Sequence, residues 1–96
     1  MRRAAPCVRH ARPAALIVTI VMRYGTPVEL QIDGARCNAG SILELLVCVG
    51  SHPEERSFTF HGDENPLRDI ATLFEYGLGE QGLAMLPPSL SYLVDR

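Results

Sequence analysis

The sequence contains no lysine, and all nine of its basic residues are arginine. It also lacks a long apolar segment. The longest nearly uncharged apolar run, Ala14 to Met22, has nine residues, whereas a membrane-spanning helix needs about 20. No internal repeat and no low-complexity linker interrupts the 96 residues. These absences exclude a collagen, a coiled coil and a polar linker, and we expect one globular domain without membrane insertion.

The sequence contains few cysteines, and their spacing does not suggest disulfide pairs. Cys7, Cys37 and Cys48 make an odd count without a CxxC pair, which disfavours a disulfide framework and favours a reducing cytoplasm. Cys7 with His10, and Cys48 with His52, offer zinc-ligand residue types, but 37 residues separate the two pairs. Zinc-finger spacing is much shorter, so we expect no metal site and interpret Cys37 and Cys48 as buried thiols.

Acidic residues are absent from residues 1–28, which contain five arginines. The remaining chain carries all eleven acidic residues, and the net charge is −2. A basic start followed by an apolar run can indicate a targeting peptide. Arg9, Arg12 and Pro13 crowd the approach to that run, and Arg23 rather than a small residue follows it, so we disfavour this interpretation. The acidic overall balance, with an isoelectric point of about 5.8, disfavours nucleic-acid binding.

Alternating patterns predict three strands. Residues 27–33 (PVELQID) alternate apolar and polar side chains, and Asp33 and Gly34 then predict a hairpin turn into a short strand over residues 36–39. Residues 56–61 (RSFTFH) alternate again, with Phe58 and Phe60 on one face. We therefore expect a sheet that is half-buried on one side.

Helical patterns separate these strands. Ser41 to Glu44 matches a capping box, which predicts a helix from Ser41 to about Cys48. Residues 65–77 carry apolar side chains at helical spacing, with Asn65 as the expected cap and Pro66 at the first helical position. Residues 11–22 are ambiguous, because their β-branched side chains favour a strand, whereas Pro13 followed by two alanines favours a helix start. The order of elements predicts an α+β fold whose sheet is covered on one face.

Two segments carry a family resemblance. Residues 10–15 (HARPAA) resemble the active-site motif of HPr, the histidine-containing phosphocarrier family of the bacterial phosphoenolpyruvate-dependent sugar phosphotransferase system. Residues 38–42 (NAGSI) resemble its regulatory serine segment, and Ser41 follows His10 by 31 positions, as the family spacing requires. The resemblance implies an open-faced β-sandwich of four antiparallel strands and three helices. We expect one domain over 1–96, with its core at about 6–80 and a C-terminal extension at 81–96.

The resemblance implies that His10 is the phosphoryl acceptor, as a pros-phosphohistidine, and that Arg12 is the phosphate clamp. The physical reason is that a residue at a helix N-cap faces unpaired N–H groups, which favour an anion, if Ala11 opens the helix. Neighbouring positive charge keeps a histidine nitrogen unprotonated as a nucleophile. Arginine offers a planar fork of donors that lysine cannot reproduce. Such a protein is a relay carrier, with no cofactor, and not an enzyme.

Ser41 has two roles that can coexist. Its hydroxyl is expected to cap the following helix, and in some bacteria a dedicated HPr kinase/phosphorylase modifies the matching serine. Five apolar residues match family positions that meet partner proteins, although for about half of them a core position is the alternative. These are Ala15, Leu16, Ile42, Leu43 and Leu46.

The implied partners are a phosphoryl donor resembling Enzyme I and a sugar-specific acceptor of the Enzyme IIA type. We expect a monomer in the cytoplasm. A regulatory binding module that signals through docking and Ser41 phosphorylation is the alternative function, and a non-functional copy is a third. Val8 stands where glycine is usual and Arg9 where an apolar residue is usual. Thr19, Met22 and Glu44 occupy positions that are often basic in the family.

The first strand of the family is expected to be truncated or absent, because only nine residues precede His10 and Pro6 interrupts them. Something must cover the edge of the strand over residues 56–61. Residues 2–8 are favoured for this position over residues 89–95 (SLSYLVD), which have strand-like character. Deleting residues 87–96 is then expected to leave thermal stability nearly unchanged.

Overall fold

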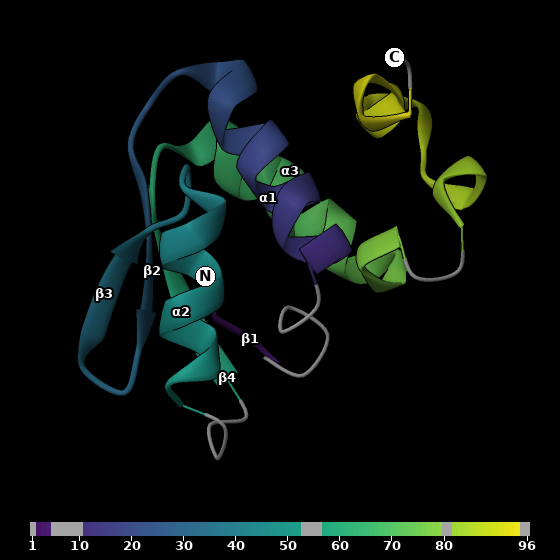
Figure 1. Ribbon diagram of the computed structural model, residues 1–96. Helices are drawn as coiled ribbons and strands as arrows, with labels where there is room; N and C mark the ends of the chain where they lie inside the picture. Colours follow the sequence, from purple (N-terminus) through teal and green to yellow (C-terminus); the bar gives the residue numbers. More distant parts are fainter. Residues whose placement is uncertain (1, 5–10, 53–56, 80–81, 95–96) are drawn as a thin grey trace.

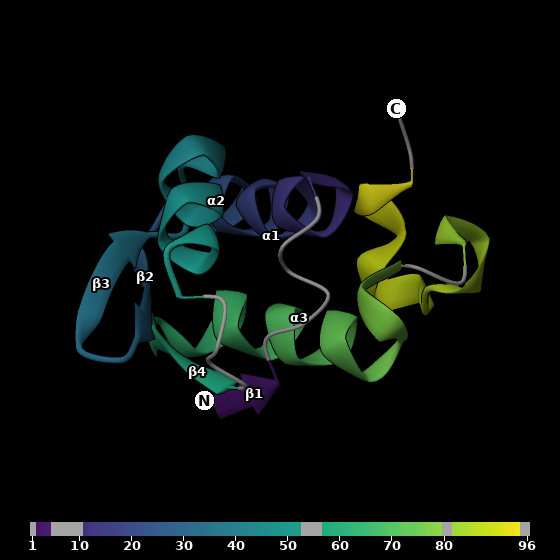
Figure 2. The same cartoon turned by 60° about the horizontal axis from the view of Figure 1, so that its bottom comes forward.

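The computed structural model of the protein describes residues 2–4, 11–52, 57–79 and 82–94. Within these residues, a four-stranded antiparallel sheet is covered on one face by three α-helices (Figure 1, Figure 2). The predicted α+β architecture is thereby confirmed. The strands are β1 (Arg2–Ala4), β2 (Val28–Ile32), β3 (Ala35–Asn38) and β4 (Ser57–Gly62). The α-helices are α1 (Ala11–Tyr24), α2 (Ile42–Gly50) and α3 (Glu64–Glu75). The 3-10 helices are η2 (Gly77–Gly79), η3 (Leu83–Met85) and η4 (Pro88–Leu93).

The edge strand of the sheet is present in shortened form. The strand order is β1-β4-β2-β3, and β1 pairs antiparallel with β4 so that Arg2 lies opposite Thr59 and Ala4 opposite Ser57. The N-terminal residues therefore occupy the edge position that the sequence analysis favoured for them. The competing tail segment does not pair with β4, because it forms η4.

The hairpin forms where Asp33 and Gly34 predicted it. Both residues have positive φ, at 47° and 81°, which is the backbone of a two-residue turn that matches the twist of the flanking strands. In β2, Val28, Leu30 and Ile32 are buried and alternate with more exposed residues. The following strand begins one residue earlier than expected, at Ala35.

Residues 11–24 resolve the ambiguous segment as helix α1. Ala14, Ile17, Ile20 and Val21 are all buried, and their spacing of three and four residues places them on one side of a helix. Burial of this stripe against the sheet outweighs the weak strand preference of β-branched residues, which is a fraction of a kcal/mol per residue. Packing therefore selects the helix.

Aromatic side chains join β4 to α3. Phe58 and Phe60 are buried with ring centroids 5.3 Å apart, and Phe74 of α3 lies 5.8 Å and 6.1 Å from them in edge-to-face geometry. The start of α3 differs from the prediction. The helix begins at Glu64 after Asp63, whereas the side chain of Asn65 accepts a hydrogen bond from Arg68 instead of capping. Pro66 still lies in the first turn, where its missing N–H has no partner to lose.

The C-terminal segment is part of the core. Leu90 and Leu93 of η4 are 0% and 2% exposed, and the Tyr92 hydroxyl donates a 2.7 Å hydrogen bond to Asp69 Oδ2, which also accepts one from Tyr24. The Arg23 guanidinium lies 4.0 Å from the centre of the Tyr92 ring. Figure 2 shows η4 beside the helix layer on the side away from β3. The expectation that residues 87–96 are dispensable for stability is therefore reversed.

This tyrosine–aspartate cluster predicts a loss of stability at alkaline pH. Hydrogen bonding to Asp69 raises the pKa of Tyr24 above its ordinary value of 10.0, and burial together with the same carboxylate raises the pKa of Tyr92. The unfolded chain releases these protons first, so their contribution is complete below about pH 10 and is lost as the pH rises further. We expect Tyr92→Phe to lower the melting temperature at neutral pH and to flatten its decline between about pH 9.5 and 11. An identical alkaline decline in both proteins would contradict this assignment.

Candidate functional site

The N-terminus of α1 is where the sequence places the candidate phosphoryl acceptor. His10 lies outside the described residues, but Ala11 is the first residue of α1. That start was the condition under which His10 precedes the unpaired N–H groups of a helix. The helix has 14 residues and no acidic residue in its first turn. Its positive end is therefore not neutralised by a carboxylate of that turn.

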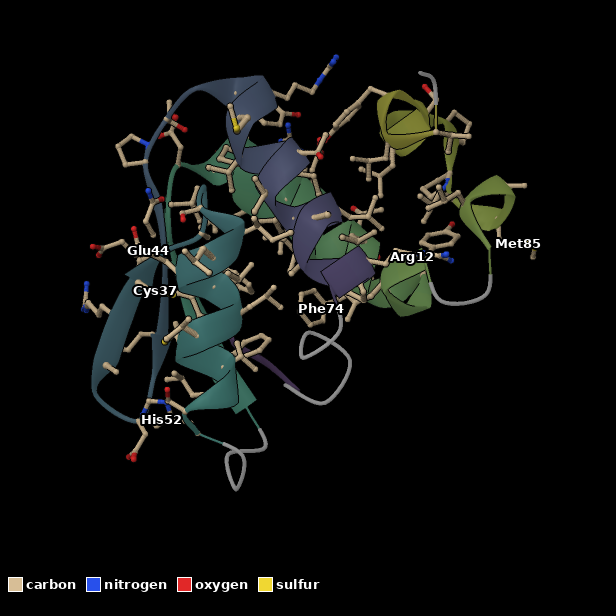
Figure 3. The ribbon with its side chains drawn as sticks, viewed as in Figure 1. Arg12, Cys37, Glu44, His52, Phe74 and Met85 are labelled. Atoms are coloured by element: carbon tan, nitrogen blue, oxygen red, sulfur yellow. The ribbon has the colours of Figure 1, made fainter. Side chains whose placement is uncertain are left out.

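Arg12 is the second residue of α1, and its side chain is exposed. Figure 3 shows it at the end of the helix that lies near η2. Among the described residues, the guanidinium makes no hydrogen bond or ion pair, in contrast to Arg36, which bonds Glu29 at 3.1 Å. Within the described part of the chain, no partner competes with an anion for this fork of donors.

The other two histidines have structural partners. The ring of His61 on β4 forms a 2.7 Å hydrogen bond between Nε2 and Gln31 Oε1. The Nδ1 atom of His52, just after α2, lies 2.8 Å from the backbone oxygen of Cys48. Neither histidine stands directly before the first residue of a helix, so among the described residues neither has the sequence position that His10 has relative to α1.

Ser41 caps α2, as the sequence predicted. Its backbone is extended, with φ −122° and ψ 115°, and its Oγ accepts a 3.3 Å hydrogen bond from the backbone N–H of Glu44. The reciprocal half of the capping box differs, because Glu44 Oε1 accepts from the backbone N–H of Asn38 at 3.2 Å. The Ser41 N–H instead donates to the Asn38 carbonyl at 3.1 Å. The carboxylate therefore links the start of α2 to the end of β3.

Ser41 does not lie at the N-terminus of α1. A Cβ atom on Gly40 would come within 3.3 Å of Val21 Cγ1, so the entry to α2 packs against the later half of α1. Val21 is ten positions after Ala11, which corresponds to about 15 Å along a helix at 1.5 Å per residue. A phosphoryl group on Ser41 would therefore not share the N-terminus of α1.

The five candidate docking residues divide between surface and core. Ile42 and Leu43 are exposed on α2, with Leu43 at 70%, whereas Ala15 and Leu46 are partly buried. Leu16 is 6% exposed, and its Cδ1 lies close enough to Gly79 that an added Cβ would meet it at 3.0 Å. Leu16 thus takes the core alternative, because the chain after α3 covers it.

The sequence analysis missed one residue of this surface. Val47 is 59% exposed and follows Leu43 by four positions, so the two side chains share one face of α2. The apolar residues at positions 42, 43, 46 and 47 could have indicated this exposed face. Only one side of α2 has to be apolar to pack on the core, so apolar residues on another side need a different explanation. Ile42, Leu43 and Val47 form an exposed apolar face, which we call the α2 face.

Met22 and Glu44 stand where the family is often basic, and both are exposed. Among the described residues, no group of three histidine, cysteine or acidic side chains is arranged to hold a metal ion. No helix in the described part of the chain is long and apolar enough to cross a membrane. The candidate site is thus described by the N-terminus of α1 with Arg12 and by the exposed α2 face.

The family model and the curated relative that match this chain agree on one family. Residues 6–75 match the family model described as the PTS HPr component phosphorylation site. The chain is 32% identical over 74 residues to the phosphocarrier protein HPr of Treponema pallidum (strain Nichols), and the match covers 75% of this chain and 84% of that protein. No solved structure gives a significant match to this chain. The matched range contains both motifs and ends before η2.

Proposed function

Because this chain belongs to the HPr family, whose members are phosphocarriers and not enzymes, we propose that it accepts a phosphoryl group on His10 and passes it on. The proposed donor is a phosphoenolpyruvate-dependent protein resembling Enzyme I, and the proposed acceptor is a sugar-specific protein of the Enzyme IIA type. The observation that carries the proposal is the position of His10, inside the matched range and directly before the first residue of α1. Such a relay would operate in the cytoplasm, without a cofactor.

The chemistry follows from the helix start. The Nδ1 atom of a neutral His10 imidazole attacks the phosphorus of the phosphorylated donor protein. One N–P bond forms as the bond between that phosphorus and the donor protein breaks. First-turn N–H groups of α1 and the Arg12 guanidinium stabilise the charge on the phosphoryl oxygens. Transfer to the acceptor reverses these events. Because the helix fixes the positions of its first-turn N–H groups, no large rearrangement of the carrier is required.

Labelled phosphoenolpyruvate with Enzyme I tests the proposal directly. The protein should acquire label that is lost in acid and kept in base, since a phosphoramidate on imidazole is acid-labile whereas a serine ester survives acid. Ser41→Ala is the matched control, because it removes the ester-forming hydroxyl and should leave labelling intact. Label that persists in acid would contradict the carrier proposal.

Arg12→Lys separates charge from geometry. Lysine keeps the positive charge but lacks the planar fork. Charge-assisted bonds of this kind are worth about 1.5–3 kcal/mol, so we expect transfer to slow by roughly 10- to 100-fold. The melting temperature should not change, because the Arg12 side chain has no partner in the described structure. Arg36→Lys on β3 is the control and should transfer phosphate at the parent rate. Equal rates for Arg12→Lys and the parent would remove Arg12 from the proposed clamp.

The α2 face is the proposed docking surface for donor and acceptor, together with Ala15 and Leu46. Leu43→Glu places a charge on this face, and we expect the KM for the carrier to rise by about tenfold or more, as for a residue central to an interface. Met85→Glu is a matched control, since Met85 is 63% exposed but lies on η3. If both substitutions raise KM equally, the effect is one of net charge and the docking assignment fails.

The regulatory binding module remains the second candidate function. The observation that favours it is the exposed apolar α2 face beginning directly after Ser41. A phosphoryl group on Ser41 would add about two negative charges at the start of this face, beside Glu44, and would weaken apolar docking. Discharge of phospho-His10 to an Enzyme IIA-type acceptor discriminates between the two functions, because a purely regulatory module would retain its label.

A further inference from the structure

Two cysteines from different elements meet at the boundary between sheet and helix layer. Cys37 lies on β3 and Cys48 on α2, both are free thiols, and both are 9% exposed. Figure 3 shows Cys37 where β3 passes beside α2. The connection between them is short, because α2 follows β3 directly and folds back along it. The two residues therefore lie opposite each other across this junction.

The two thiols line one depression at the junction of β3 and α2. After burial, interaction with Cys48 is the next cause that raises the pKa of Cys37, in agreement with this arrangement. A disulfide requires facing Cβ atoms and a bonded distance of about 2.05 Å. The proposed bond forms by side-chain rotation and approach of α2 toward β3. Their position at one depression distinguishes this pair from two unrelated core thiols.

A surface depression gives small molecules access to the pair. It has a volume of about 500 Å³, and both cysteines line it together with Leu43, Val47 and His52. Leu43 and Val47 are exposed, so the depression is bordered by solvent-facing side chains of α2. A low-molecular-weight reagent can therefore approach the sulfur atoms from this side without unfolding of the domain.

We propose that Cys37 and Cys48 form a redox-active dithiol that a small disulfide of the glutathione class oxidises to an intramolecular disulfide, tying α2 to β3. The Cys48 thiolate attacks one sulfur of the reagent, which forms a mixed disulfide and releases one thiolate. Cys37 then loses its proton and attacks the Cys48 sulfur, which releases the second thiolate. The protein loses two electrons and two protons, and the reagent becomes two thiols.

The environment of the pair sets the order of these steps. Burial, and then the hydrogen bond to Cys48, raise the pKa of Cys37 to about 12. The thiolate is the nucleophile in exchange, so Cys37 is poorly suited to attack first. Cys48 is therefore the attacking residue and Cys37 the resolving one. The disulfide would close a short loop through the start of α2 and should raise the melting temperature by roughly 5 °C or more.

The test uses the full chain with Cys7→Ser, which leaves only the two thiols in question. Oxidised glutathione is added to the folded protein at about pH 8, near the ordinary pKa of a thiol, and intact mass, peptide mapping and the melting temperature are recorded. We expect loss of two hydrogens, a Cys37–Cys48 linked peptide, no retained glutathione and no dimer. Dithiothreitol should reverse the change. A stable glutathione adduct, or no reaction in the folded state while the urea-unfolded chain reacts, would overturn the proposal.

Two further variants in the same background test the order of attack. Cys37→Ala should accumulate glutathione on Cys48, because no resolving thiol remains. Cys48→Ala should react at least about tenfold more slowly in the folded state, since burial, the largest cause of the raised pKa of Cys37, remains in this variant. The two-thiol parent carries the main result, so the proposal stays testable even if a single variant folds poorly. Equal reaction rates of the two variants would overturn the assigned order.

Discussion

Replacing His10 with alanine should abolish acceptance of label from phosphoenolpyruvate and Enzyme I while the fold is retained. The expected loss is complete, because neither described histidine, His52 or His61, stands directly before a helix, and both have structural hydrogen bonds. A nucleophile that forms the covalent intermediate cannot be replaced by the positive end of α1 or by Arg12, which stabilise charge but supply no ring nitrogen. Label that remains on His10→Ala would contradict the carrier proposal.

A matched histidine variant controls for indirect effects. His61→Gln removes an imidazole from β4, where its ring is bonded to Gln31, and glutamine can still hydrogen-bond there. This variant should accept label at the parent rate. Circular dichroism and the melting temperature of both variants show whether the sheet and helices persist. If His61→Gln also fails to accept label although it is folded, the loss in His10→Ala cannot be assigned to the nucleophile.

Local sequence patterns predicted the elements in which buried side chains recur at a regular spacing. The alternation in residues 27–33 and 56–61 identified β2 and β4, and the positive-φ pair Asp33 and Gly34 identified the hairpin. The capping box identified the start of α2, although Glu44 bonds to Asn38 instead of Ser41. These features depend on residues near one another in sequence, which is why a sequence pattern can predict them.

Features that depend on distant residues could not be read in the same way. The β-branched residues of α1 left helix and strand open until packing on the sheet decided for the helix. Leu16 matched a docking position, but Gly79 covers it, and nothing near Leu16 in the sequence indicates that contact. The start of α1 at Ala11 meets the condition that the sequence analysis set for His10, because the motif at residues 10–15 is local. The partition of the docking residues was not predictable, because it depends on the path of the chain after α3.

The C-terminal segment is the clearest case of a structure that sequence patterns could not predict. The sequence SLSYLVD has the residue types of a strand, but Leu90 and Leu93 are spaced by three positions and both are buried in η4. The segment bends at Leu90, whose φ of −109° and ψ of 17° are not helical, so the burial of both leucines depends on this local bend and not on a regular repeat. The partner of Tyr92 is Asp69, which is 23 positions away. Only the tertiary structure distinguishes this docked helix from an edge strand or a free extension.

Removing residues 87–96 should therefore destabilise the protein strongly. The truncation takes away two leucines that are 0% and 2% exposed, and burial of such a side chain is worth about 2–5 kcal/mol when it is truncated to alanine. It also leaves Asp69, which is 6% exposed, with one of its two tyrosine donors. Domains of this size have total stabilities of about 5–15 kcal/mol. The expected loss is comparable to the whole, and we expect a mostly unfolded chain at 37 °C.

Point substitutions separate lost packing from lost chain length. Leu90→Ala should lower the free energy of unfolding by about 3 kcal/mol, which corresponds to a fall in melting temperature of more than about 10 °C. Val94→Ala is the matched control, because Val94 is 43% exposed one residue beyond η4, and it should change stability by less than about 1 kcal/mol. Urea denaturation of the parent and the three variants measures these differences. A truncated chain that melts within about 3 °C of the parent would show that η4 rests on the helix layer without stabilising it.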